Sequence, residues 1–274
     1  MKLKHIIIAV MATLVTACGN TPRNEKNDTR EPQIFPDYCG VTVPVGIAPM
    51  NFDVCGGADR IDLTVSGTKG GTLHTNAGSV DMDIDEWHAL LEKNRGARLD
   101  FSLAVRRNGE WTRYATFPMY VSDAPLDDWG LTYRRIAPSY VNYNQMGIYQ
   151  RCLANFDETP ILENTADPGS CINCHTANRT DPRQFTFHVR GPHGATLIQQ
   201  DGRREWLNTA TDSTLAACVY PYWHPTGKYV AFSTNVTRQD FHATRGERIE
   251  VLDLKSDLQV YCPATHELLL SPLL

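Results

Sequence analysis

After its first 17 residues the sequence lacks any apolar run long enough to cross a membrane as a helix, so the body of the protein is not predicted to span a bilayer. It also lacks an excess of basic charge, because 26 basic and 31 acidic residues leave a net charge of −5. That balance argues against nucleic acid or an anionic membrane surface as a partner. No Ser-His-Asp set, glycine-rich phosphate loop or pair of catalytic carboxylates is apparent, so the sequence offers no hydrolase or nucleotide site.

The most informative segment that is present is CINCH, at residues 171–175. Two cysteines three positions apart, with a histidine directly after the second, are typical of covalent haem attachment. Cys171 and Cys174 can each add to a haem vinyl group as a thioether, which holds His175 where its imidazole can bind the iron. The motif therefore predicts one haem c per chain, with His175 as the proximal ligand. A di-haem peroxidase would need two such motifs.

The ligand on the other side of the iron decides what such a haem does. A histidine or methionine there makes an electron carrier, whereas an open position permits small-molecule binding or peroxide chemistry. His188 is the first candidate, because Phe187 and Val189 lie on one face of a predicted strand and His188 on the other. Met146 is the second candidate. This set of residues favours an electron carrier or haem-binding protein over an enzyme.

A zinc site is the main alternative for the same cysteines. Cys171 and Cys174, followed after thirteen residues by His188 and then His193, match a zinc-finger spacing. A zinc finger of that kind places both histidines on one helix, but Gly191-Pro192 breaks any helix between them. A redox-active CxxC pair and a structural disulfide are further alternatives.

The N-terminus predicts export and lipid anchoring. Lys2 and Lys4 precede an apolar segment of about ten residues, which is too short to span a bilayer. The sequence VTAC at residues 15–18 then resembles a bacterial lipobox, which implies a signal peptide at residues 1–17 and a lipid-modified Cys18. The resemblance places the protein in the bacterial envelope, lipid-anchored at the outer membrane and facing the periplasm. The c-type cytochromes that the CxxCH motif resembles also acquire their haem outside the cytoplasm.

The remaining cysteines predict at most two disulfides. Five cysteines are left once Cys18 and the motif are set aside, so at least one is unpaired or pairs between chains. The pairs Cys39–Cys55 and Cys218–Cys262 are the expected bridges, and Cys152 is the remaining residue.

The composition divides the rest of the chain into four parts. Residues 18–35 are polar and charged, which predicts a flexible tether, and residues 36–136 predict a β-rich, sandwich-like domain. Residues 137–182 are expected to be an irregular haem-attachment segment. Within these parts the predicted strands are residues 59–65, 99–105 and 111–117, with a turn at Asn108-Gly109, and the predicted helices are residues 86–94 and 144–156.

The last part, residues 183–274, resembles TolB-like (PD40) β-propellers. The sequence PYWHPTGKYVAFS at residues 221–233 resembles the P-x-W-S-P-D-G-K-x-I-A-F repeat of that family, with His224 and Thr226 as departures. Strands are expected at 185–189, 195–206, 229–233, 248–254 and 258–261, with a turn at Asp201-Gly202. Only about two blades fit, whereas a closed ring needs about four to eight. The blades therefore belong to a longer protein, or pack on the N-terminal domain or a partner.

The sequence as a whole predicts a mainly β, membrane-tethered lipoprotein with one c-type haem, used for electron transfer or redox sensing. Its partners are expected to be the membrane, through the lipid, and a redox or envelope protein that the sequence does not identify. The alternative is a TolB-like interaction module of an envelope assembly, with a structural zinc site.

Overall fold

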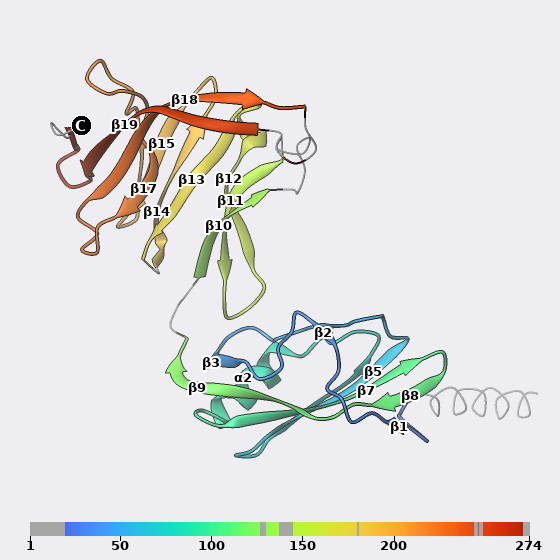
Figure 1. The fold of residues 1–274 in the computed structure, drawn as a ribbon. Helices are drawn as coiled ribbons and strands as arrows, with labels where there is room; N and C mark the ends of the chain where they lie inside the picture. Colours follow the sequence, from blue (N-terminus) through green and yellow to red (C-terminus); the bar gives the residue numbers. More distant parts are fainter. Residues whose placement is uncertain are drawn as a thin grey trace, which may run out of the picture. The chain divides into compact units, whose positions relative to one another are not determined.

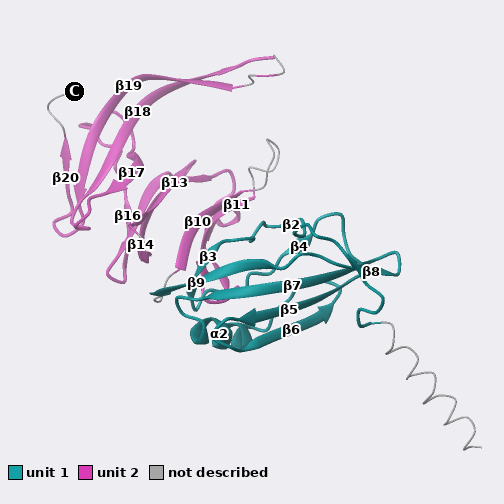
Figure 2. Ribbon diagram, turned by 60° about the horizontal axis from the view of Figure 1, so that its bottom comes forward, with its two compact units in different colours: residues 1–128 teal, residues 129–274 magenta. Residues whose placement is uncertain are grey.

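The computed structural model describes residues 20–126, 130–136, 145–179, 181–243, 246 and 249–270. It divides into two compact units, residues 1–128 and 129–274, which are described here separately (Figures 1 and 2). The fold is mainly β, as predicted, with one α-helix among the described residues. The predicted signal peptide and Cys18 lie outside the described residues.

Unit 1 is built on one seven-stranded sheet. Its strands run in the order β1-β8-β7-β5-β6, and β9 pairs with both β7 and β3. The sequence predicted a sandwich-like domain, and the described residues form this sheet, a two-stranded sheet of β2 and β4, and α2. The elements are β1 (Lys26–Asn27), β2 (Ile34–Phe35), β3 (Thr42–Val45), β4 (Asp53–Val54), β5 (Arg60–Gly67), β6 (Thr72–Ala77), α2 (Ile84–Lys93), β7 (Arg98–Arg107), β8 (Glu110–Arg113) and β9 (Phe117–Pro125).

Alternating side chains explain which face of this sheet is buried. Ile61, Leu63 and Val65 on β5 enter the apolar core, in which Trp87 of α2 packs on Phe101 of β7. The predicted helix at residues 86–94 is confirmed as α2. Its N-terminus is capped by the Asp83 carboxylate, which accepts hydrogen bonds from the next helical amides, and its Trp87 face is buried. The predicted turn at 108–109 is also confirmed, with positive φ at both residues.

The tether prediction for residues 18–35 is wrong for the part that the structure describes. β1 pairs in parallel with β8, Glu25 forms an ion pair with Arg113, and β2 pairs with β4. The composition predicted a free chain because it holds few apolar residues. Ion pairs and backbone hydrogen bonds to the sheet hold the segment instead.

Unit 2 consists of three antiparallel sheets that follow one another along the chain, each with its strands in sequence order. The first sheet has three strands and the other two have four each (Figure 1). The strands are β10 (Gly130–Ile136), β11 (Met146–Cys152), β12 (Glu158–Glu163), β13 (Cys171–Asn178), β14 (Asp181–Arg190), β15 (Ala195–Gln200), β16 (Arg203–Leu207), β17 (Val219–Trp223), β18 (Val230–Phe241), β19 (Ile249–Cys262) and β20 (Glu267–Leu270).

The middle sheet is buried on both faces. Phe185, Phe187 and Ile172 of that sheet pack with Ile148 of the first sheet. On the opposite face, Ile198 packs with a cluster from the third sheet that includes Trp223 and Phe232. The three sheets therefore stack face to face, held by two separate apolar layers.

Two predictions for residues 137–182 are wrong. The segment 144–156 was predicted to be a helix, but its described part contains strand β11, which pairs with β10 on one side and β12 on the other. The haem-attachment segment was predicted to be irregular, yet residues 171–178 form strand β13. The local sequence permitted a helix because it holds no proline or glycine after Gly147, but pairing with neighbouring strands decides the outcome. The predicted strands at 185–189, 195–206 and 229–233 and the Asp201-Gly202 turn are confirmed in β14, β15, β16 and β18. The segments 248–254 and 258–261 were predicted to be two strands, but their described residues belong to one strand, β19.

Candidate functional site

The CxxCH motif lies on β13, the first strand in the order of the middle sheet. Asn173 pairs with His188 and Thr176 with Thr186, so that Cys174 and His175 together face the single residue Phe187. This is a β-bulge, and Cys174 adopts a left-handed conformation with φ of 53°. The alternation is regular from Cys171 to Asn173, and the bulge interrupts it at Cys174 and His175.

Both thiols of the motif are free. Cys171 is half-buried and Cys174 is buried, and neither forms a disulfide. Cys171 pairs across the sheet with Arg190, whose Nη2 lies 4.0 Å from Cys174 Sγ. Because Ile172 enters the layer shared with the first sheet, regular alternation directs Cys171 toward the opposite face.

His175 lies between the middle and first sheets. Its Nε2 is 2.9 Å from Thr132 Oγ1 of β10, and its ring centroid is 6.4 Å from that of Phe185. Burial lowers the pKa of His175 to about 4, so its imidazole is neutral at pH 7. A neutral imidazole is the form that binds iron.

His188 lies on the other face of the same sheet, as the sequence predicted. Its Nδ1 is 3.0 Å from Thr196 Oγ1, and that hydroxyl donates to the Cys218 carbonyl at 3.2 Å. Since the hydroxyl proton is used there, Nδ1 of His188 donates and Nε2 carries the lone pair. Burial, assisted by Arg190, lowers the pKa of His188 to about 4. His188 therefore has a ligand-competent nitrogen, but on the face opposite His175.

Met146 lies beside the motif. Its side chain is buried, and its Sδ accepts a hydrogen bond of 3.4 Å from the amide of Ile172, between the two cysteines. Asn164 Oδ1 accepts from the Met146 amide at 3.0 Å, which fixes the start of β11. Met146 and His175 thus both occupy the region where the first and middle sheets meet.

The two lowered histidine pKa values predict that the haem-free protein loses stability as pH falls. The unfolded chain takes up these protons near pH 6.5, whereas folded His175 and His188 take them up only near pH 4. Below pH 6.5 protonation therefore favours the unfolded state, and stability declines down to about pH 4. NMR titration of the ring protons checks this. Midpoints near 6.5 for both residues would contradict their burial.

The expected disulfides are not formed. Cys39, Cys55, Cys152, Cys218 and Cys262 are all free. Cys218 is fully buried and its thiol donates to Gln259 Oε1 at 3.0 Å, so that bond takes the place of the expected bridge to Cys262.

The rate of thiol alkylation is expected to differ between Cys218 and Cys262. Burial raises the pKa of Cys218 to about 11, whereas hydrogen bonds from Thr265 lower the pKa of Cys262. Because the thiolate is the reacting form, Cys262 should react at least about tenfold faster than Cys218 with iodoacetamide at pH 8. Mass spectrometry of timed digests measures both rates. Equal rates in the folded protein, or a recovered Cys218–Cys262 peptide, would refute this assignment.

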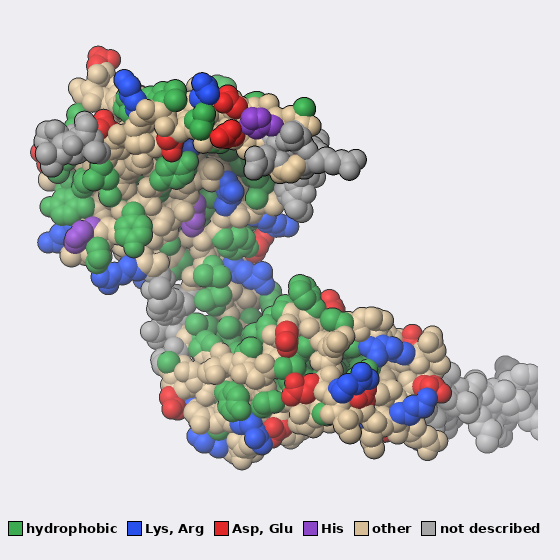
Figure 3. All heavy atoms as spheres, viewed as in Figure 1, with side chains coloured by type: hydrophobic (Ala, Val, Ile, Leu, Met, Phe, Trp, Pro, Cys, Tyr) green, Lys and Arg blue, Asp and Glu red, His purple; other side chains and the backbone are tan. Residues whose placement is uncertain are grey.

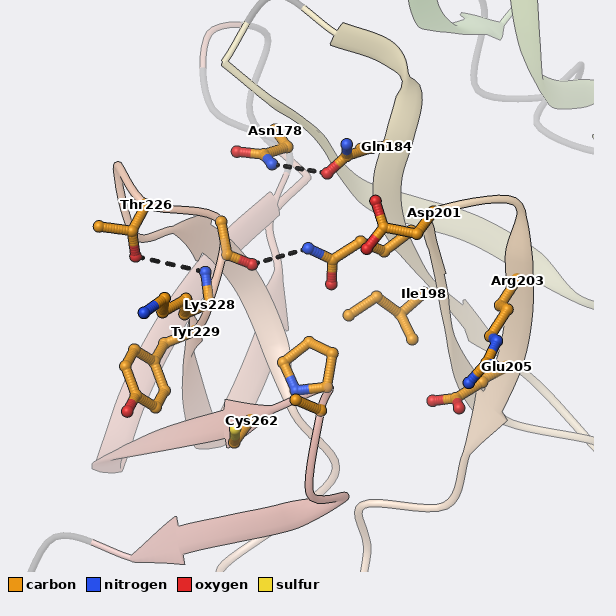
Figure 4. A pocket seen from close by; sticks show the side chains of 14 residues that line it. Asn178, Gln184, Ile198, Asp201, Arg203, Glu205, Thr226, Lys228, Tyr229 and Cys262 are labelled. Carbon is orange, nitrogen blue, oxygen red and sulfur yellow. Dashed lines mark hydrogen bonds between the residues drawn. The ribbon is translucent and has the colours of Figure 1, made fainter.

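Sequence reasoning missed a cavity of about 1040 Å³ between the middle and third sheets. It lies where the turns Asp201-Gly202 and Pro225–Gly227 approach each other, and Figure 4 shows Arg203, Glu205, Lys228 and Cys262 around it. The two predicted turns were its sequence signal. That they lie at the same end of adjacent sheets follows only from the stacking.

The structure does not bring the four ligands of the zinc alternative, Cys171, Cys174, His188 and His193, into one metal-holding group. His193 is exposed and its Nδ1 lies 3.0 Å from Asp167 Oδ1. Within the described ranges, no group of three or more His, Cys, Asp and Glu side chains is arranged to hold a metal ion. In the same ranges, no helix is long and apolar enough to cross a membrane.

Comparison with known proteins gives no identification. No family model, no curated protein and no solved structure matches this chain.

Proposed function

We propose that this protein is a membrane-tethered, c-type cytochrome-like lipoprotein that carries one covalent haem for electron transfer or redox sensing in the bacterial envelope. The observation that carries the proposal is the set of donors in residues 171–175. Two uncrosslinked thiols and one half-buried, neutral imidazole lie on a single bulged strand. The export signal and lipobox at residues 1–18 fit the compartment in which such haems are attached.

The residues present fit a haem in their donor chemistry. Cys171, directed to the opposite face of β13, and Cys174 would hold the vinyl groups, and His175 would hold the iron. A bound haem supplies one-electron redox chemistry. Ile148 and Phe185, both fully buried, pack in the same apolar layer as Ile172 of the motif.

Of the two candidates, Met146 would be better placed than His188 to hold the haem together with His175. His188 faces the third sheet, whereas Met146 is on the side of the first sheet, as His175 is. The hydrogen bond to Thr196 leaves His188 Nε2 free to bind a metal, so His188 is the second candidate.

We also propose that unit 2 is a partial TolB-like propeller. Three consecutive antiparallel sheets stacked through apolar layers support this arrangement, as successive blades do. The same observation favours the second candidate function, an interaction module of an envelope assembly. The structural zinc site of that alternative has no such support, because Cys171 and Cys174 belong to no metal-holding group among the described residues.

An absorption spectrum of protein produced together with haem-attachment machinery tests the two functions. The cytochrome proposal requires a Soret band that persists after denaturation, since thioether bonds survive unfolding. Elemental analysis of the same sample should then give iron and no zinc. Stoichiometric zinc without a haem band would support the interaction module instead.

A further inference from the structure

The N-terminal segment of unit 1 is fastened to the sheet from its first described residue. The Asn20 carbonyl accepts a hydrogen bond of 2.8 Å from Asn76 Nδ2 on β6. Further along, Glu25 Oε1 lies 2.7 Å from Arg113 Nε, and Lys26 Nζ lies 2.7 Å from Glu110 Oε2. Because β6 and β8 lie at opposite sides of the strand order, residues 20–27 cross the sheet.

The segment crosses the polar face of the sheet. Arg113 donates to Ser102 Oγ at 2.9 Å and lies 3.8 Å from Asp62, which also bonds His74 and Asn76. The side chains of Glu25 and Arg113 are both only 28% exposed, so their ion pair is shielded from water and worth more than an exposed pair. We name residues 20–27 the strap.

The strap shortens the connection to the lipid that the proposed function places on Cys18. Only Gly19 separates Cys18 from Asn20, so two peptide steps of about 3.8 Å each join the lipidated residue to the folded unit. A flexible tether of residues 18–35 would instead have a root-mean-square length of about 23 Å. The length of this connection decides whether unit 1 moves freely or lies against the membrane.

We infer that unit 1 docks on the lipid bilayer through the end of its sheet that carries Asn76 and Gly78, with the strap as the fastening. This inference rests on the proposed lipid anchor. Arg60 lies at this end, where its guanidinium bonds the Asn76 carbonyl at 3.0 Å, and Arg107 bonds the Gly57 and Cys55 carbonyls nearby. Figure 3 shows Lys and Arg side chains, interspersed with acidic ones, at the β8 end of unit 1. Because the net charge of −5 does not attract the whole chain to an anionic surface, the lipid brings the unit to the bilayer, and these cations then contact headgroup phosphates.

Limited trypsin digestion of the full chain tests the strap independently of the lipid. Residues Arg23 and Lys26 are cleavage sites that the docked strap should protect. Glu25→Ala removes the ion pair with Arg113 and should accelerate cleavage at these sites several-fold. Glu31→Ala is the matched control, because Glu31 is exposed and forms no ion pair among the described residues. Equal cleavage of wild type and both variants would overturn the strap.

Fluorescence quenching tests the docking itself. A fluorescent amino acid is placed at Gly78, where an added Cβ meets nothing within 4 Å, or at exposed Lys69, beyond the other end of β6 and about 20 Å away. Lipidated protein is reconstituted in phosphatidylethanolamine and phosphatidylglycerol vesicles that contain a headgroup quencher. Quenching should be several-fold stronger at position 78 than at 69, and Glu25→Ala should reduce the difference.

The outcomes separate the two proposals. Equal quenching at both positions in vesicle-bound wild type overturns the docking while leaving the anchor in place. A mass spectrum showing no acyl group on Cys18, together with no vesicle binding, refutes the anchor and with it the docking. The Cys18→Ser variant cannot be lipidated, so it should show neither vesicle binding nor quenching if the lipid attaches the protein to the vesicle.

Discussion

Protein carrying both Cys171→Ser and Cys174→Ser is expected to lose all covalently bound haem. Serine hydroxyls do not form thioether bonds with haem vinyl groups, so any haem that remains is held only by the iron and is released on denaturation. Haem staining of a denaturing gel and the mass of the intact chain measure the loss. Each single variant retains one thiol and should keep a reduced yield, attached through one bond.

The matched control is the double variant Cys152→Ser and Cys262→Ser. It removes two thiols from the same unit, both partly exposed and outside the motif. It should keep its haem. If the control loses haem as fully as the motif variant does, the effect is a general consequence of misfolding and the attachment sites are unproven. Covalent haem in the motif variant would place the attachment elsewhere.

The His175→Ala variant tests the role of His175 as iron ligand separately from the covalent attachment of the haem to Cys171 and Cys174. The two thioether bonds should still form, so the chain mass should still include the haem. The spectrum should change from six-coordinate low spin toward high spin, because the iron loses its proximal imidazole. An unchanged spectrum would show that another side chain is the proximal ligand. The same measurement on Met146→Ala and His188→Ala decides between the two candidates for the other side of the iron.

The sequence predicted the alternation of buried strands well, because a period of two is visible in the chain itself. Residues 59–65 read correctly as a half-buried strand, since Ile61, Leu63 and Val65 are the residues that enter the core. The face of His188 was also predicted correctly from its neighbours Phe187 and Val189.

The placement of His175 could not be predicted in this way. The bulge puts two residues of β13 opposite one residue of β14, and an extra residue in a strand exchanges the faces of all that follow. Regular alternation would have placed His175 and His188 on the same face. A bulge depends on the partner strand and on the left-handed Cys174, neither of which has a signature in the five-residue motif.

The strand β11 was missed for a related reason. Its residues 146–152 hold neither a clear helical nor a clear two-residue period, and Met146, Gly147 and Ile148 are all buried. A buried run of this length fits a helix or a strand equally well until its neighbours are known. β10 and β12, which pair on its two sides, decide between them.

Phe187→Ala is expected to destabilise unit 2 by about 3–5 kcal/mol, the range for deleting a fully buried aromatic side chain. Phe187 has 0% exposure and stacks on Phe185 at a centroid distance of 6.2 Å, and its other ring contact is Trp206 at 6.3 Å. It lies in the layer between the middle and first sheets, so its loss leaves a cavity beside the bulge that carries Cys174 and His175. Denaturant unfolding followed by Trp fluorescence measures the change.

The control for this substitution is Phe241→Ala, in the same unit. Phe241 is 73% exposed, so its truncation should change the unfolding free energy by no more than about 0.5 kcal/mol. Equal effects of the two substitutions would show that the apolar layer is not formed in solution. A large effect of Phe187→Ala alone, together with a lower yield of attached haem, would link the packing of the first and middle sheets to the motif, because Phe185 of the same layer lies beside the ring of His175.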